Sequence, residues 1–485
     1  MKKLQLKGIW PMLLFVILAY SSRAQTYKID TLQFKGDINK YINVVILGDG
    51  YTSSEQNLFK SDATKYMNNF MFSQTPYKEY KNYFNVFLIE VPSPESGIKH
   101  PRTASDCPAA GTHPSSNPNN FFGTTFDLAG IHRLVSPKDE TKVTNVLAAN
   151  FPNYDQAYII ANSSQYGGAG GQFATFTTAS ASGEIGLHEG GHSFGELADE
   201  YWAGAQYAAE KPNMTKETSA TQVKWKNWMN VNGIGIYPHS TDASWKKPRT
   251  GECKMEVLGK PFCSVCNETI VEKIHSLVRP VYQQTPLQST VTVTNQLANF
   301  SILYMLPISN TMSTRWIVDG YASAKNQVSV IKWTTSGKVV AVNKDAYVLN
   351  GTTLTPGKHQ LKVYTLDTTP LTRKDLHPGQ DIDSIIWNLN VTLTGIEISQ
   401  GVVNGIKLYP NPVKDELTLS YVLEKQQTII TNVYTVDGRR VLTFVDNASQ
   451  GEHSKRIDLG YLPAGNYLVE LRSDELSITQ QVIKE

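Results

Sequence analysis

The sequence predicts an α/β domain followed by two small all-β, sandwich-like domains. In the first half of the chain, strand-like runs rich in β-branched residues alternate with helical stretches, which is typical of an α/β sheet. Three such strands are expected near residues 42–47, 84–91 and 158–161. From about residue 287 the runs become β-rich and are separated by turn signals, which favours small antiparallel domains. The length of 485 residues suits about three domains.

These patterns divide the chain into five segments. The segments are a signal peptide over 1–24, the α/β domain over 25–285, a β-sandwich domain over 286–393, a linker over 394–405 and a C-terminal β module over 406–485. The strongest local signal in the last module is Asp437-Gly438, which predicts a tight hairpin turn between two strands.

The first 24 residues have the three parts of a secretory signal peptide. Lys2, Lys3 and Lys7 precede a mostly apolar run over 9–20, and Ser22-Arg23-Ala24 provides a small-residue cleavage site. Removal of this segment takes away four basic and no acidic residues, so the formal charge changes from +2 to −2. The mature chain shows no basic stripe for nucleic acid and no second apolar run long enough to span a bilayer. We therefore expect export through the periplasm and no transmembrane helix in the mature chain.

The pentapeptide His188-Glu189-Gly190-Gly191-His192 indicates a specific type of reaction. On a helix, residues four apart lie on one face, so both imidazoles can bind one Zn²⁺ ion with Glu189 beside it. Zinc acidifies water and polarises a carbonyl group, and a carboxylate placed there can carry the proton to the leaving amine. The motif therefore predicts metal-assisted hydrolysis, with His188 and His192 as ligands and Glu189 as the general base.

The third protein ligand is a separate question. The motif continues as His-Glu-x-x-His-x-x-Gly and so resembles the metzincins, which place a ligand six residues after the second His, but this position is Ala198. Asp199 follows it, and on a continuing helix Asp199 would lie about 10 Å further along the axis. We expect Gly195 to provide a turn with positive φ that brings Asp199 to the ion. Glu200 is the near alternative and Glu196 a weaker one. A role for Asp199 in orienting the imidazoles also stays open.

A glycine-rich run lies just before the motif, between the third predicted strand and the predicted helix. Its spacing matches no nucleotide-binding loop, and a flexible loop is one interpretation. The other is a strand edge at the rim of a substrate cleft, where glycines let a peptide backbone approach closely. The cleft candidates are Gly167, Gly168, Gly170 and Gly171.

The chain has four cysteines, at positions 107, 253, 263 and 266. In an exported protein their even number favours two disulfides, and sequence cannot choose among the three possible pairings. A structural zinc site that uses Cys263 and Cys266 is the alternative.

Several further segments show that the first domain resembles the IgA-type metallopeptidases, bacterial zinc peptidases placed beside the metzincins. The resemblance covers about residues 28–285 and rests on Ile46 to Thr52, Ser93 to Gly97, His188 to Tyr201, and Phe262 to Cys266. It implies a metzincin-like α/β fold, a Zn²⁺ cofactor, His188 and His192 as ligands and Glu189 as the catalytic carboxylate. It also suggests a methionine turn beneath the ligands, for which Met255 is the candidate; an ordinary core methionine is the alternative.

The C-terminal module resembles the type A sorting domain of type IX secretion. The resemblance lies in Leu408 to Pro412, Asp437 to Arg439, Leu462 to Tyr467, and the terminal Ile483-Lys484. It implies that the type IX machinery carries the chain across a Gram-negative outer membrane, after which the protein is released or attached to the surface.

Together these features predict an exported zinc endopeptidase that hydrolyses extracellular proteins. The alternative is a catalytically inactive cell-surface binding protein, or adhesin, that uses its β domains; the presence of Glu189 counts against it. A zinc amidase acting on non-protein amides would share every ligand and differ only in the cleft.

Overall fold

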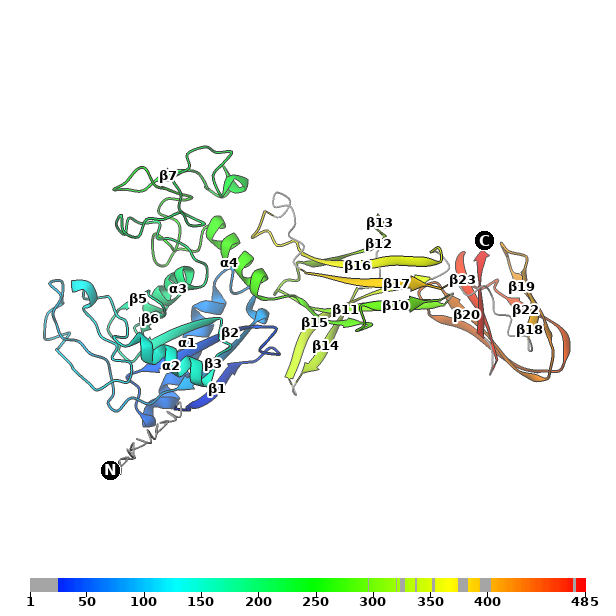
Figure 1. The fold of residues 1–485 in the computed structure, drawn as a ribbon, viewed down its shortest axis with the longest axis horizontal. Helices are drawn as coiled ribbons and strands as arrows, with labels where there is room; N and C mark the ends of the chain where they lie inside the picture. The colour runs from blue at the N-terminus through cyan, green and yellow to red at the C-terminus, as the bar shows by residue number, and fades with distance from the viewer. Residues whose placement is uncertain are drawn as a thin grey trace, which may run out of the picture.

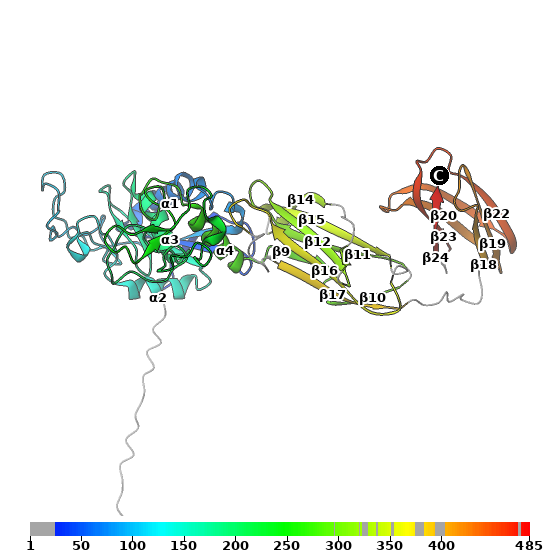
Figure 2. The same ribbon diagram turned by 90° about the horizontal axis from the view of Figure 1, so that it is seen from above.

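The computed structural model describes residues 25–294, 296–319, 321–322, 328–335, 338–350, 354–373, 383–392, 403–473 and 477–485. The predicted signal peptide and most of the predicted linker lie outside these residues. Three regions follow one another along the described chain (Figure 1), and Figure 2 shows the same order from above. No helix among the described residues is long and apolar enough to cross a membrane.

The first region is built on a six-stranded mixed sheet with the order β1-β3-β2-β4-β6-β5. The four inner strands run parallel to one another, and the two edge strands run antiparallel to their neighbours. The predicted strands near 42–47, 84–91 and 158–161 are confirmed as β2, β3 and β4. The bounds are β1 Lys28–Gln33, β2 Ile42–Asp49, β3 Phe84–Glu90, β4 Gln156–Ala161, β5 Gly168–Ala169 and β6 Ala174–Thr177.

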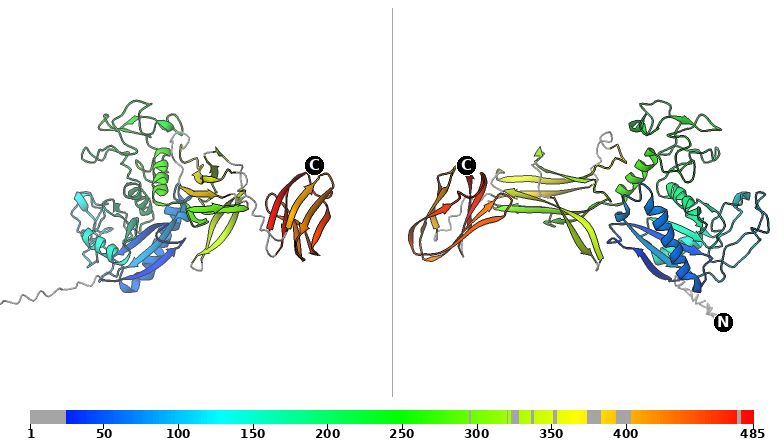
Figure 3. Two further views of the ribbon diagram at one scale, coloured as in Figure 1. Left: turned by 45° about the vertical axis from the view of Figure 1, so that its right-hand side comes forward. Right: turned by 180° about the vertical axis from the view of Figure 1, so that it is seen from behind.

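Helices cover both faces of this sheet (Figure 3). Because successive strand residues point to opposite faces, β2 supplies two cores: Val44 and Ile46 pack with α1, α3 and α4, whereas Val45 and Leu47 pack with α2. The α-helices are α1 Gln56–Asn69, α2 Glu140–Asn150, α3 Ser182–Ser193 and α4 Ser264–Leu277. Short elements are the 3-10 helices η1 Ser53–Glu55, η2 Met71–Ser73, η3 Lys81–Tyr83, η4 Leu128–Gly130 and η5 Lys226–Trp228, and the small hairpin of β7 Tyr237–Pro238 and β8 Lys246–Lys247.

The buried carboxylate of Asp49, at the carboxyl end of β2, organises the loops at that end of the sheet. It accepts hydrogen bonds from the backbone N–H groups of Phe122 at 3.1 Å and Thr124 at 2.9 Å. The neighbouring Gly50 has a φ of 80°, and a Cβ there would lie 2.4 Å from the carbonyl oxygen of Gly97. The segments around residues 46–52 and 93–97 are therefore tied together by close backbone packing that requires glycine.

The second region consists of two sheets that share one core. One sheet has the order β10-β17-β16-β12-β13 and the other β14-β15-β11-β9, and inward side chains of both, including Phe300 of β11 and Trp387 of β17, form a single buried cluster. The bounds are β9 Val281–Thr285, β10 Thr290–Val293, β11 Leu297–Met305, β12 Met312–Val318, β13 Tyr321–Ala322, β14 Val328–Thr335, β15 Lys338–Asn350, β16 Gly357–Asp367 and β17 Asp383–Val391.

Strand β9 lies just before the predicted domain boundary at residue 286 but belongs to a sheet of the second region. It precedes that boundary, yet it pairs antiparallel with β11 from Ser301↔Thr285 to Tyr304↔Val281. The strand sits at a sheet edge and is only partly buried, so it carries little of the alternation that marks a strand in the sequence.

A buried polar network joins the first region to the second. Asp367 of β16 accepts a hydrogen bond from the Tyr80 hydroxyl at 2.5 Å and lies 3.2 Å from Nε2 of His275 in α4. Arg279 reaches Asp383 at 2.5 Å, and the Ile308 N–H donates to the carbonyl of Glu79 at 2.6 Å. The β-rich region is therefore packed on the first region through specific contacts.

The third region contains the sheets β18-β19-β22 and β21-β20-β23-β24, whose inward residues form another single core. The predicted hairpin at Asp437-Gly438 is confirmed, because it joins the antiparallel pair β20 and β21 and Gly438 has a φ of 81°. The bounds are β18 Val403–Tyr409, β19 Glu416–Leu423, β20 Gln427–Thr435, β21 Arg440–Ala448, β22 Gly451–Asp458, β23 Gly465–Arg472 and β24 Ser477–Lys484.

Candidate active site

The two predicted histidine ligands face each other from one side of α3. Their Nε2 atoms lie 3.2 Å apart, and the side chains of His188 and His192 are 7% and 28% exposed. The glycines between them allow close packing. A Cβ at Gly190 would lie 2.6 Å from the Tyr158 hydroxyl, and one at Gly191 would lie 2.7 Å from the sulfur of Met255. Both positions between Glu189 and His192 therefore require glycine, because Tyr158 packs against one and Met255 against the other.

The turn after α3 differs from the expected one. The helix ends at Ser193, and the residue with positive φ is Glu196, at 55°, rather than Gly195. Gly195 serves close packing instead, because a Cβ there would lie 2.9 Å from the carbonyl oxygen of Gly191. The Leu197 N–H donates to that same carbonyl at 3.0 Å, which closes the turn and reverses the chain toward the histidines.

The reversed chain brings Asp199 to the histidine pair. Its Oδ1 atom lies 3.1 Å from Nε2 of His188 and 3.2 Å from Nε2 of His192. Asn213 fixes the preceding residue, since its side-chain amide exchanges two hydrogen bonds with the backbone of Ala198, at 2.7 and 2.8 Å. The exposed Glu196 side chain instead pairs with Lys273, so it does not join the cluster.

Backbone carbonyls orient both imidazoles. Nδ1 of His188 lies 3.0 Å from the carbonyl oxygen of Lys254, and Nδ1 of His192 lies 2.8 Å from that of Leu197. Each Nδ1 therefore carries the proton that it donates, and in the neutral rings both Nε2 lone pairs point at the same place as the Asp199 carboxylate.

This cluster fits a zinc ion. Zinc bonds of about 2.0–2.1 Å place two tetrahedral nitrogen or oxygen ligands about 3.3 Å apart, and the three distances here are 3.1, 3.2 and 3.2 Å. Burial lowers the pKa of His192, but the carboxylate of Asp199 outweighs it and raises the pKa to about 9. Burial opposes the charged form of Asp199, but its hydrogen bonds with the two histidines hold its pKa well below the usual range. The site therefore attracts a positive charge.

Glu189 lies next to the histidine cluster, with Oε2 4.0 Å from Nε2 of His192. Its side chain is 13% exposed, and burial raises its pKa, while the two histidines partly offset this effect. The backbone N–H of Gly170 hydrogen-bonds to the carboxylate, and a Cβ at Gly170 would lie 2.2 Å from Oε2. The carboxyl group is thus confined between α3 and the glycine-rich run, with its affinity for a proton increased.

The glycine-rich run divides into two parts. Gly167 and Gly168 are buried, and Cβ atoms there would lie 2.6 Å from Val135 and 2.6 Å from the carbonyl oxygen of Thr175. These two glycines therefore serve packing and cannot line an open cleft. Gly170 and Gly171 are exposed at the end of the edge strand β5, so these two glycines remain candidates for the rim of a substrate cleft.

Met255 lies beneath the histidine helix in a tight turn, where the N–H groups of Glu256 and Val257 donate to the carbonyl of Cys253 at 2.9 and 2.8 Å. The Met255 side chain is fully buried, its sulfur faces Gly191, and its carbonyl accepts the Glu200 N–H at 2.8 Å. Met255 therefore packs against α3 from below, and its role as the methionine turn stays a prediction.

The alternative ligand Glu200 points away from the histidines. It is fully buried, and its Oε1 lies 3.2–3.9 Å from the sulfur atoms of three cysteines. Burial raises the pKa of its carboxyl group well above the usual range. Adjacent residues thus serve different clusters, Asp199 the histidines and Glu200 the cysteines. The three cysteines are Cys253, Cys263 and Cys266.

The two expected disulfides are absent, because all four cysteines are free. The sulfur atoms of Cys263 and Cys266 are 3.6 Å apart and those of Cys253 and Cys266 are 3.7 Å apart, whereas a disulfide bond is about 2.05 Å long. Cys107 lies in a separate group with His100, Asp127 and His132. The even number of cysteines gave the wrong prediction, because three of them lie together in one cluster and the fourth lies in another.

Sequence reasoning missed three residues that support the site. They are Asn213, which holds Ala198; Lys254, whose carbonyl orients His188; and Tyr201, whose phenol hydrogen-bonds to Asp199 and whose ring stacks on His188 with centroids 6.3 Å apart. Burial raises the pKa of Tyr201, so its hydroxyl keeps its proton. Only Tyr201 carried a local signal, since it ends the segment His188 to Tyr201.

Two segments of the chain match known protein families. Residues 31–248 match the family model described as IgA Peptidase M64, so the first region is similar to the peptidases of that family. Residues 407–485 match the secretion system C-terminal sorting domain, which indicates a type IX substrate that is secreted or attached to the cell surface. No curated protein matches the chain.

Proposed function

We propose that this protein is a zinc endopeptidase that cleaves proteins outside the cell. The observation that carries the proposal is the convergence of His188, His192 and Asp199 within 3.2 Å of one another, with the Glu189 carboxylate beside them. The M64 match supports the peptidase class, and the sorting domain supports an extracellular substrate. A metzincin-like arrangement is supported by α3, the turn after it and the Met255 turn beneath.

The histidine pair and Asp199 would hold the ion, and zinc supplies Lewis acidity that acidifies water and polarises a carbonyl group. Glu189 accepts the proton of the attacking water and delivers it to the leaving nitrogen. Its raised pKa suits both steps, because a carboxyl group with a pKa nearer neutrality exchanges protons in both directions. The 28% exposure of His192 leaves one side of the cluster open to solvent and substrate.

The edge strand β5 would bind the substrate backbone. It pairs with β6 on one side, the N–H of its Gly168 donates to the Arg133 carbonyl at 3.0 Å, and it leads into the exposed Gly170 and Gly171 beside Glu189. An extended peptide bound along Gly170 and Gly171 would place a peptide bond next to the general base. Specificity would then depend on the loops around this edge, which include the segment preceding α2.

A direct test is cleavage of a denatured protein by the purified chain, with and without a chelator. We expect cleavage that a chelator abolishes and added zinc restores. A zinc amidase would leave proteins intact while hydrolysing small acyl amides. An inactive binding protein would cleave neither substrate when loaded with zinc, and either result would refute the proposal. The adhesin alternative receives no support from the family comparisons.

A further inference from the structure

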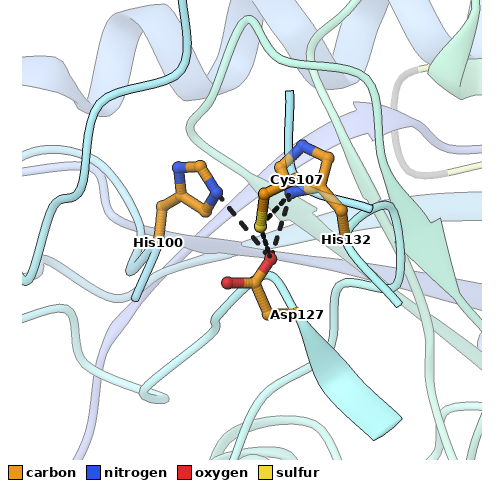
Figure 4. A group of neighbouring side chains, drawn as sticks. All are labelled: His100, Cys107, Asp127 and His132. Atoms are coloured by element: carbon orange, nitrogen blue, oxygen red, sulfur yellow. Dashed lines mark hydrogen bonds and ion pairs between the residues drawn. The ribbon is translucent and has the colours of Figure 1, made fainter. Parts of the chain in front are cut away.

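A second metal-ligating group lies outside the candidate active site, in the segment between β3 and α2. Residues 91–139 are all described and contain only the short helix η4 and isolated bridges. Segments of this length without regular structure are uncommon in compact domains and need another source of order. Four side chains of the segment converge on one point (Figure 4), and they are His100, Cys107, Asp127 and His132.

The distances within this group suit a tetrahedral ion. Oδ1 of Asp127 lies 3.0 Å from Nδ1 of His132, 3.3 Å from the Cys107 sulfur and 3.7 Å from Nε2 of His100. The sulfur lies 3.8 Å from Nδ1 of His132. Zinc bonds of about 2.1 Å to nitrogen or oxygen and about 2.3 Å to sulfur give tetrahedral ligand separations of about 3.3–3.6 Å.

His100 gives an independent indication of a cation site. Its side chain is 2% exposed, and its Nδ1 lies 3.0 Å from the carbonyl oxygen of Pro114, so Nδ1 carries the proton. Its Nε2 is buried, has no hydrogen-bond partner among the described residues, and faces the Asp127 carboxylate. A lone pair opposite a carboxylate is unfavourable unless a cation lies between them.

We propose that His100, Cys107, Asp127 and His132 form a structural site for a divalent transition metal, with zinc the favoured ion. Two imidazoles, one thiolate and one carboxylate fill all four tetrahedral positions, so the site has no open corner for water. The ion would tie together three parts of the long segment. It would also support the active-site rim, because the carbonyl of Arg133, next to His132, accepts the Gly168 N–H of β5 at 3.0 Å.

The test combines metal analysis with cobalt spectroscopy on the full chain. We expect Cys107→Ser to lose one equivalent of zinc relative to the unmodified protein and, after cobalt substitution, to lose part of the thiolate-to-cobalt absorption. His113→Ala, in the same segment, is the matched control and should keep both. Equal zinc content in Cys107→Ser and the unmodified protein would overturn the proposal.

A measurement on the unmodified protein covers the case in which Cys107→Ser fails to fold. The Cys107 side chain is partly exposed, so its alkylation can be followed by mass spectrometry. We expect bound zinc to slow alkylation of Cys107 at least about tenfold, because coordination ties up the thiolate. Chelation should increase proteolytic cleavage within residues 98–136. Alkylation and cleavage that ignore zinc would refute the site.

A different observation carries a second site, formed by Glu200 and the three clustered cysteines. The Glu200 Oε1 to sulfur distances are 3.2, 3.3 and 3.9 Å, and the measured sulfur pairs are 3.6 and 3.7 Å apart, close to the roughly 3.8 Å of two thiolates on zinc. The Cys263 N–H donates to the Cys253 sulfur at 3.4 Å, and Oε2 of Glu200 is buried without a hydrogen-bond partner.

We infer that Glu200, Cys253, Cys263 and Cys266 bind a structural zinc ion beneath the active site. Every ligand is buried, which is typical of a closed site. The ion would fix both chain segments that serve the histidines, because Glu200 follows Asp199 and Cys253 precedes Lys254, whose carbonyl orients His188.

The two structural sites control for each other experimentally. Cys266→Ser should lose one zinc equivalent and keep the Cys107 site, and Cys107→Ser should do the reverse. Thiol titration of the denatured, chelated protein should find four free thiols. Two thiols would show a disulfide and refute the cysteine-rich site, and so would unchanged zinc content in Cys266→Ser. Neither result depends on peptidase activity, so failure here is distinguishable from failure of the proposed function.

Discussion

The histidine cluster on α3 and the cluster in the segment before α2 use the same three donors, two histidines and one aspartate, in different surroundings. In the second cluster Cys107 supplies a fourth donor, and His100 and His132 are only 2% and 8% exposed. In the first, the nearby fourth group is the Glu189 carboxylate, 4.0 Å from Nε2 of His192, and His192 is 28% exposed. Four protein ligands close a zinc site, whereas three leave the fourth coordination position free for water or substrate.

The supports of the two clusters also differ. The α3 cluster is set by a helix and by backbone carbonyls, with Met255 packed below. The other is set by loop residues, and Arg102, Asp127 and Ala129 of that loop segment have positive φ. A helix fixes its ligands before an ion binds, whereas a loop site gains its order partly from the ion. Loss of metal should therefore affect activity at the first cluster and local order at the second.

The largest effect is expected from Glu189→Gln. Removal of the general base should lower kcat for peptide hydrolysis about 10²–10⁴-fold while leaving zinc content unchanged, because Glu189 is not counted among the ligands. Steady-state kinetics and metal analysis measure both quantities. Glu196→Gln, an exposed acid in the adjacent turn, is the control. Proteolysis at the original rate in Glu189→Gln would refute the general-base role of Glu189, and with it the proposed functional difference between the two clusters.

The two aspartates allow the most direct contrast. Loss of a residue that only orients a ligand lowers metal affinity roughly 10–100-fold. Asp199→Ala removes a proposed ligand itself, so it should weaken zinc binding at α3 by more than this, and peptidase activity should fall with it. Asp127→Ala should lose the zinc ion of the site that includes Cys107, while the α3 site keeps its zinc ion. Zinc titration with a competing chelator measures both affinities. Full metal occupancy in Asp199→Ala would place the third ligand at another residue.

Met255 tests the support beneath the first cluster. Met255→Ala should destabilise the first region by about 2–5 kcal/mol, because it leaves a cavity below Gly191. Met255→Leu conserves volume and should cost less than about 1.5 kcal/mol. Chemical unfolding followed by tryptophan fluorescence measures both. Equal stability of the two variants would show that this methionine does not support the helix by packing.

The smallest effect concerns acid stability at the contact between the first two regions. Burial opposes ionisation of Asp367, but hydrogen bonds from His275, Thr311 and Tyr80 outweigh it and lower its pKa from 3.8 to about 2. A lowered pKa stabilises the folded protein above about pH 4, by about 2 kcal/mol, and this contribution is lost as the pH falls through 2. Asp367→Asn should thus lower Tm at pH 5 but not near pH 2. A constant difference in Tm between pH 5 and 2 would contradict the assignment.

Local sequence patterns specified the parts of this protein whose physics is local. The period of four on α3 placed His188 and His192 together, and Asp437-Gly438 specified its hairpin, because each depends on backbone geometry over a few residues. Strands β2, β3 and β4 were predictable for the same reason, since their apolar runs are short for a helix and that of β2 is rich in β-branched residues and is followed by Gly48-Asp49-Gly50. The family motifs added the peptidase class and the sorting domain.

Tertiary contacts decided the rest. Sequence favoured Asp199 over the adjacent Glu200 only through a turn expected at Gly195. The two carboxylates separate because the turn at Glu196 and the hydrogen bonds of Asn213 direct Asp199 to the histidines and Glu200 to the cysteines. The grouping of Cys253 with Cys266, and of His100 with His132, joins residues far apart along the chain. Such groupings depend on how loops close over the core, and loop closure leaves no period in the sequence from which it could be read.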